Sequence, residues 1–121
     1  MITNLKITIR FPGWHKESVA YHSDDGNKFC NNSYGGQSYS ETWGEIGDVI
    51  GCGYYPQTGI VFFTKNGKNL GNAFCGVRHT WFPAVSSDNK CRIECNFSGE
   101  KEFEYKGARN NNVAGYFPKK A

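Results

Sequence analysis

Long apolar runs are missing from this sequence of 121 residues. No stretch approaches the roughly 18 apolar residues that a membrane-spanning helix needs. The chain also does not open with a basic segment, an apolar run and a small-residue cleavage site, as a secretory leader would. These absences lead us to expect a cytoplasmic protein that does not insert into membranes.

Clusters of reactive or metal-binding side chains are also missing. The three histidines lie in unrelated segments, and the five cysteines include no CxxC pair and leave one thiol over in any disulfide scheme. Cys91 and Cys95 would share one face of a strand, but zinc would need two further ligands nearby. The Asp24-Asp25-Gly26 step is ordinary turn chemistry and a poor calcium site. We therefore predict free thiols, no cofactor, no metal and no enzymatic activity.

Basic side chains do not form a stripe. The formal net charge is +3, and the lysines and arginines are scattered between acidic residues along the chain. Proteins that bind nucleic acids usually carry a basic stripe or patch. We therefore expect no nucleic-acid partner.

Aromatic residues and glycine are plentiful, whereas proline is scarce. Aromatics make up 16% of the chain, with 15 glycines and 4 prolines. Aromatic side chains suit a pleated, half-buried surface, and glycine suits tight turns, so the composition favours an all-β antiparallel sandwich. Alternating apolar positions and turn signals predict strands at 5–9, 18–22, 28–30, 49–55, 60–65, 68–74, 81–85 and 91–97, with a short one near 103–105 and a long surface loop at 31–45.

The clearest local signal is a hairpin around Asn66-Gly67, because this pair tolerates the positive φ angles of a type I′ turn. Simple pairing across the turn sets Lys65 opposite Lys68, Phe63 opposite Leu70 and Val61 opposite Asn72. Val61, Phe63 and Leu70 should then form one buried face, with Phe62 on the other face over Gly71.

Two further segments give predictions about burial. In residues 49–55, Ile50, Cys52 and Tyr54 share one face, and glycines 51 and 53 on the other face should let a neighbour pack closely. In residues 91–97, the alternation predicts that Ile93, Cys95 and Phe97 are buried.

The order of several motifs resembles the SPRY domain family. These motifs are Val19 to Gly26, Gly47-Asp48-Val49-Ile50-Gly51-Cys52-Gly53, Phe62-Phe63-Thr64-Lys65-Asn66-Gly67, Leu70-Gly71, Phe82-Pro83-Ala84-Val85 and Asn96-Phe97. The segment from Pro12 to Val19 is most similar to SPRY domains of Ran-binding-protein-like proteins and of fungal adaptors for ubiquitin ligases. The resemblance implies a SPRY domain at residues 1–109, followed by a loosely ordered tail at 110–121.

The resemblance also implies a function. SPRY domains are two-sheet sandwiches without an active site, and they recognise peptide segments or folded partner proteins through loops. Carried over residue by residue, the partner-binding positions are Pro12, Trp14, Tyr21, His22 and Tyr34. A role in a ubiquitin-ligase adaptor or scaffold is implied by the family alone, since no Pro-Pro-x-Tyr docking motif occurs in the chain.

The chain departs from the family before its Pro-Gly-Trp segment, where only about ten residues stand in place of several strands. We therefore expect a sandwich that lacks some N-terminal strands and that self-associates through exposed strand edges. Two other functions stay open. One is a lectin-like module in which Trp14, Trp43 and Tyr34 stack on sugar rings, although core packing is the favoured role for Trp43 and Trp81. The other is a truncated regulatory fragment.

Overall fold

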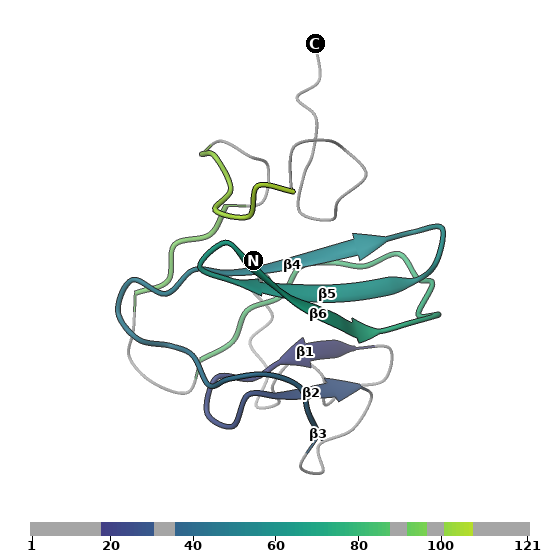
Figure 1. The fold of residues 1–121 in the computed structure, drawn as a ribbon, viewed down its shortest axis with the longest axis horizontal. Coiled ribbons are helices and arrows are strands. Elements are labelled where there is room, and N and C mark those ends of the chain that lie inside the picture. Colours follow the sequence, from purple (N-terminus) through teal and green to yellow (C-terminus); the bar gives the residue numbers. More distant parts are fainter. Residues whose placement is uncertain (1–17, 31–35, 88–91, 97–100, 108–121) are drawn as a thin grey trace.

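The computed structural model describes residues 18–30, 36–87, 92–96 and 101–107. These ranges contain six strands and no helix, arranged as two antiparallel three-stranded sheets, one above the other (Figure 1). The strands are β1 (Val19–Tyr21), β2 (Asn27–Cys30), β3 (Gln37–Ser38), β4 (Ile50–Tyr55), β5 (Ile60–Lys65) and β6 (Lys68–Phe74). The predicted all-β sandwich is thus confirmed. A helix long and apolar enough to cross a membrane is not found in the described ranges.

The first sheet has the order β1-β2-β3. A hairpin joins β1 to β2 through the predicted Asp-Gly turn, which is closed by the amide of Gly26 donating to the carbonyl of His22 at 3.2 Å. The predicted loop at 31–45 needs a correction, because residues 37 and 38 form β3 and pair with β2. A strand of two residues has no periodicity, so the sequence carried no signal for it.

The second sheet has the order β4-β5-β6, and its β5–β6 hairpin turns at Asn66-Gly67 as predicted. Lys65 pairs with Lys68 as predicted, but two other predicted positions are wrong, because Phe62 lies opposite Asn72 and not Gly71, and Val61 has a different partner. The pairing shifts twice along the hairpin, so that Val61 lies opposite Phe74 and not Asn72. Gly71, with a φ of +98°, lies opposite the shift between Phe62 and Thr64, and a glycine with positive φ is typical of a β-bulge.

The core lies between the two sheets. Tyr21 from β1 meets Val61 and Phe63 from β5 and Ala73 from β6, and all four are buried. Partly buried side chains surround them, including Ile50, Cys52, Tyr54 and Leu70. The predicted burial of Val61 and Phe63 is confirmed, with Leu70 packed at the edge of the same cluster.

The other face of the second sheet carries a smaller aromatic cluster. Phe62 is only 1% exposed and lies opposite Gly53 in the neighbouring strand. Its ring stacks on Tyr55 with the centroids 5.4 Å apart and meets Tyr105 edge-on at 5.6 Å. The predicted close packing over the glycine face is therefore confirmed, because Phe62 fills the space that a side chain at residue 53 would need.

The C-terminal strand predictions are wrong where the structure describes those residues. Segments 81–85, 92–96 and 101–107 form no strand, and Ile93 and Cys95 are exposed. Pro83 cannot donate to a ladder, which disfavours a strand at 81–85. Alternation in 91–97 can bury one face only if another strand pairs alongside, and no described strand does. Phe97 and the segment 5–9 lie outside the described residues.

Candidate functional site

Three connections meet at one end of the sandwich, which we call the loop end (Figure 1). They are the β1–β2 turn (residues 22–26), the β3–β4 connection (residues 40–49) and the β5–β6 hairpin tip (residues 65–68). Two backbone hydrogen bonds tie the first two together, from Ser40 N to Gly26 O at 3.0 Å and from Trp43 N to Ser23 O at 3.1 Å. The loop end is therefore a continuous surface built from segments far apart in the sequence.

Asn66 fastens the hairpin tip to the β3–β4 connection. Its backbone amide donates to Val49 O, and its side-chain oxygen accepts from Val49 N, each at 2.8 Å. Its side-chain Nδ2 also donates to Asp48 Oδ1 at 3.0 Å. Residue 66 thus shapes the turn through its φ of +52° and links two loops through its amide group.

Asp48 makes several hydrogen bonds inside the β3–β4 connection. Its Oδ2 accepts hydrogen bonds from the amides of Gly44 and Glu45, both at 3.0 Å, and its own amide donates to Glu45 O at 2.9 Å. The hydrogen bond from the Asn66 side chain, followed by that from Gly44, lowers the pKa of the Asp48 carboxyl below its ordinary value. The charged carboxylate is the form that holds this loop in shape.

Lys65 joins the same two segments from the hairpin side. Its ammonium lies 3.3 Å from Glu41 Oε1 and donates to Thr42 O at 3.2 Å. The Lys65 side chain is 17% exposed and the Glu41 side chain 60% exposed, so the pair is only partly screened by water. Lys65 therefore connects the hairpin tip to the β3–β4 connection, and its charge is already paired with Glu41.

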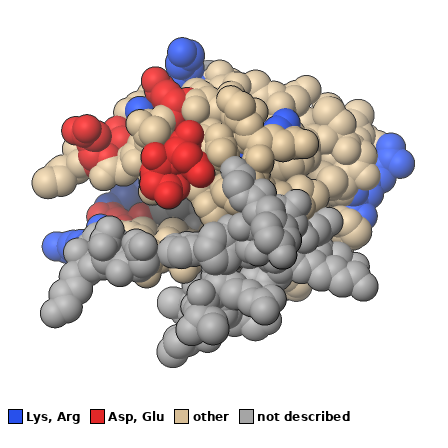
Figure 2. All heavy atoms as spheres, turned by 90° about the horizontal axis from the view of Figure 1, so that it is seen from below, with Lys and Arg blue, Asp and Glu red and all other residues tan. Residues whose placement is uncertain are grey.

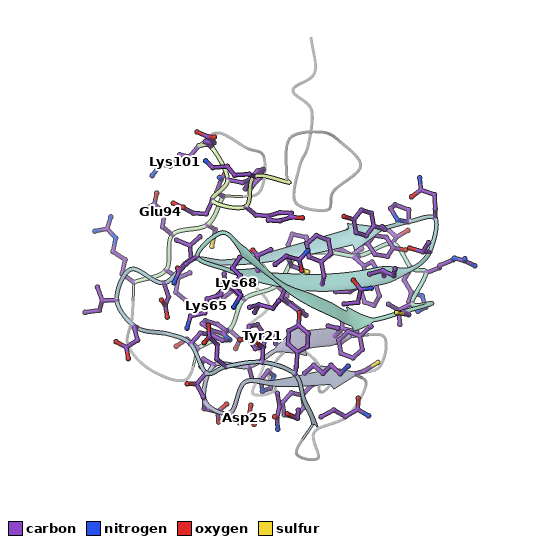
Figure 3. The ribbon with its side chains drawn as sticks, viewed as in Figure 1. Tyr21, Asp25, Lys65, Lys68, Glu94 and Lys101 are labelled. Carbon is purple, nitrogen blue, oxygen red and sulfur yellow. The ribbon has the colours of Figure 1, made fainter. Side chains whose placement is uncertain are left out.

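The structure places two of the five predicted site residues, and their side chains point away from each other. Tyr21 lies between the sheets, 6% exposed, with its hydroxyl donating to Glu41 O (Figure 3). His22, the next residue, faces the opposite side of the sheet and stacks on Phe29 with ring centroids 3.9 Å apart. Tyr21 thus supports the β3–β4 connection from the core, and His22 is the one of the two that stands nearer the surface.

The other three predicted residues, Pro12, Trp14 and Tyr34, lie outside the described residues. The predicted core roles of Trp43 and Trp81 are confirmed, since both pack against the buried cluster. The Trp43 ring lies 5.8 Å from that of Tyr21. A ring held in this way is poorly placed to stack on a sugar, which weakens the lectin-like alternative.

The described residues offer little reactive chemistry. They contain no group of three or more His, Cys, Asp or Glu side chains that could hold a metal ion. Burial raises the pKa of the Cys30 thiol and raises that of Cys52 to about 11. These two thiols are protonated near neutral pH and are weak nucleophiles.

Sequence reasoning missed one residue of this surface, Ile46. It is 107% exposed, more than any other large apolar side chain in the described ranges, and it lies between Gly44 and Gly47. Both glycines have positive φ angles, +114° and +92°. An apolar residue between glycines in a polar loop could have indicated this exposed position. A single isoleucine shows no periodicity, however, so the pattern analysis did not find it.

Comparison with known proteins identifies the family of this chain. The family model of the SPRY domain matches residues 5–100. The chain belongs to the SPRY domain family. It is 43% identical over 97 residues to Protein ssh4 of Sclerotinia sclerotiorum and 40% identical over 97 residues to Ran-binding protein 10 of Danio rerio, in each case over 79% of this chain.

The matched part is a small share of these relatives, 18% of the first and 16% of the second. A crystal structure of a human SPRY domain matches with a TM-score of 0.47 and 35% sequence identity, over 63% of this chain and 52% of the other. The family model and the two relatives thus show the domain family, and this chain spans less than a fifth of the length of these relatives.

Proposed function

We propose that this chain is a non-enzymatic protein–protein interaction module, which recognises a peptide segment or a partner protein through the loop end. The observation that carries the proposal is the network around Asp48 and Asn66, which fixes two loops in one arrangement. A surface that is ordered before binding loses less conformational entropy when a partner docks. The family membership supports the same conclusion, since one relative is named a Ran-binding protein.

The binding residues in this proposal are Pro12, Trp14, Tyr21, His22 and Tyr34. Of these, His22 lies in the loop end, and Tyr21 contributes through its hydroxyl, which donates to Glu41 O in the β3–β4 connection. Tryptophan and tyrosine are enriched among the residues that dominate binding energy, because they bury a large, rigid area. The stacking of His22 on Phe29 supports its part in the proposal, because it limits the orientations of the imidazole.

The wider role we propose is target selection within an adaptor or scaffold of a ubiquitin ligase in the cytoplasm. Similarity to Protein ssh4 and to a Ran-binding protein supports the adaptor role. The four cysteines in the described residues are free thiols, which fits a reducing compartment. No specific observation favours the lectin-like alternative.

The proposal is tested by the double variant Trp14→Ala/His22→Ala. Affinity capture with the full chain should lose its protein partners, whereas circular dichroism should show that the fold survives. The matched control is His79→Ala/Phe82→Ala, a histidine and an aromatic residue that are both exposed outside the loop end. Unchanged capture by a folded Trp14→Ala/His22→Ala variant would lead us to abandon the assignment of these residues.

A further inference from the structure

Ile46 lies at the corner of a turn that several hydrogen bonds hold together. The turn is closed by the Asp48 amide donating to Glu45 O at 2.9 Å, and the Asp48 carboxylate holds the amides of Gly44 and Glu45. The side chain of Ile46 is fully exposed, so it does not pack against the rest of the fold. An apolar side chain that is both ordered and exposed is well prepared for burial against a partner.

The charge around Ile46 differs in sign from that of the whole chain. Residues 22–26, 40–49 and 65–68 contain five carboxylates (Asp24, Asp25, Glu41, Glu45 and Asp48) and two lysines (Lys65 and Lys68), which gives a formal charge of 2 − 5 = −3. The whole chain has +3. One of the two lysines, Lys65, is already paired with Glu41.

Figure 2 shows the Asp and Glu side chains of the visible face gathered in one half of the molecule, whereas Lys and Arg lie on both sides. Such a separation of charge orients an approaching partner and selects its sign. A negatively charged partner, including an acidic or phosphorylated segment, would be repelled by the carboxylates of the loop end.

From these observations we infer that the loop end binds a basic peptide segment that carries an apolar anchor. Lysine or arginine side chains of the segment meet the carboxylates of the two loops, and an aliphatic or aromatic side chain packs on Ile46. This inference rests on the proposed function and gives it the chemistry of its partner. An anionic membrane surface is disfavoured by the same carboxylates.

The inference is tested by selecting binders of the full chain from a random peptide display library. The enriched peptides should combine lysine or arginine with a neighbouring apolar residue. Ile46→Ser should weaken a selected peptide roughly tenfold or more, since a buried isoleucine contact is lost. The control Phe82→Ser removes an apolar side chain that is 82% exposed outside the loop end, and it should leave the affinity unchanged.

The proposed role of the loop-end carboxylates is tested by separate variants. Asp24→Asn/Glu45→Gln should lower the affinity of a selected peptide and flatten its dependence on salt, because two exposed carboxylates of the surface are lost. The control Glu94→Gln/Glu102→Gln neutralises two carboxylates outside the loop end, whose side chains are 66% and 81% exposed. It should change neither quantity.

Three results would overturn the inference. One is enrichment of acidic peptides, which would leave the proposed function intact if they still require the loop end. Another is an Ile46→Ser variant that binds selected peptides as well as the original chain does. The third is Ile46-dependent binding to vesicles of equal parts phosphatidylcholine and phosphatidylserine, which would assign the surface to membranes. Failure of the full chain to capture any protein partner would count against the proposed function itself, and the Trp14→Ala/His22→Ala variant tests the assignment of those two residues separately.

Discussion

At the scale of single residues, Asn66 shows how one side chain serves two purposes. Its positive φ was foreseeable from the Asn-Gly pair, and so was the turn. Its links to Val49 and Asp48 were not foreseeable, because they join residues 17 and 18 positions apart. Sequence patterns indicate local geometry, whereas such contacts depend on how the loops are brought together.

Asn66→Gly should separate these two purposes. Glycine allows the same turn and keeps the backbone amide, but it lacks the side-chain amide that bonds to Val49 and Asp48. The pKa of Asp48 should rise toward the ordinary aspartate value of about 3.9, because the hydrogen bond from the Asn66 side chain, the largest cause of the lowered pKa, is lost. A carboxyl titration followed by NMR checks this. An identical midpoint in the original chain and the variant would refute the role given to Asn66.

The same depressed pKa has a consequence for stability. A carboxyl with a lower pKa in the folded than in the unfolded state stabilises the fold above its unfolded pKa, and this contribution is lost as the pH falls through the folded value. Unfolding by denaturant between pH 3 and 7 should therefore show less acid sensitivity in Asn66→Gly. Equal acid sensitivity would argue against a stabilising role for the Asp48 charge.

At the scale of elements, the strands formed where a partner strand was available. The alternation in 60–65 and 68–74 predicted a hairpin and the buried face of Val61 and Phe63 correctly. It failed in 92–96, where Ile93 and Cys95 are exposed. Alternation shows which side of a strand could be buried, but it does not show whether a neighbouring strand exists.

Gly53→Ala should destabilise the β4–β5 pair. A Cβ at this position would lie 2.1 Å from Phe62 Cζ, and the Phe62 ring is fully enclosed, so the strand or the ring must move. We expect a loss of about 1–3 kcal/mol in the free energy of unfolding, typical of overpacking. Denaturant unfolding of the purified variant measures it.

The Phe62→Leu background provides the control for this prediction. Leucine lacks the ring tip that the new methyl group would touch, so Gly53→Ala should cost less there. The two substitutions should therefore be non-additive, as expected for residues in contact. Strict additivity would show that the glycine is needed for another reason.

At the scale of the whole molecule, two side chains connect the first sheet to β6, one from Lys28 in β2 and one from Tyr39, the residue after β3. Lys28 Nζ donates to Ala73 O and the Tyr39 hydroxyl donates to Gly71 O, each at 2.6 Å. Occupied carbonyls on an outer strand are less available for pairing with another chain. The prediction of self-association therefore concerns other edges more than this part of β6.

Tyr39→Phe should weaken the connection between the sheets and remove part of the alkaline sensitivity. Burial, the largest cause, raises the pKa of Tyr39 to about 12, while the amide of Phe63 donates to its oxygen at 3.2 Å. A raised pKa means that the stabilisation is complete below the unfolded value of about 10 and is lost as the pH rises through 12.

Two measurements check this prediction. At pH 7 the variant should lose about 0.5–1.5 kcal/mol of unfolding free energy for each of the two missing hydrogen bonds, to Gly71 O and from the Phe63 amide. Between pH 10 and 12, its stability should fall less steeply than that of the original chain. An equal alkaline slope in both chains would contradict the assignment to Tyr39.

The candidate site could be predicted in outline only. Ordered motifs identified the family and pointed to Tyr21 and His22. In the structure Tyr21 is the last residue of β1 and His22 follows it, and the two side chains face opposite ways. Ile46 and the Asp48 network escaped notice because a loop surface is assembled by contacts between distant residues. Such contacts leave no period in the sequence.

The most direct test of the account is hydrogen–deuterium exchange of the full chain with and without a captured partner. We predict that binding slows amide exchange in residues 22–26, 40–49 and 65–68, with little change on the outer face of the β4–β6 sheet around Tyr55 and Phe62. Protection confined to that outer face, with the loop end unchanged, would contradict the claim that this chain binds through its loops.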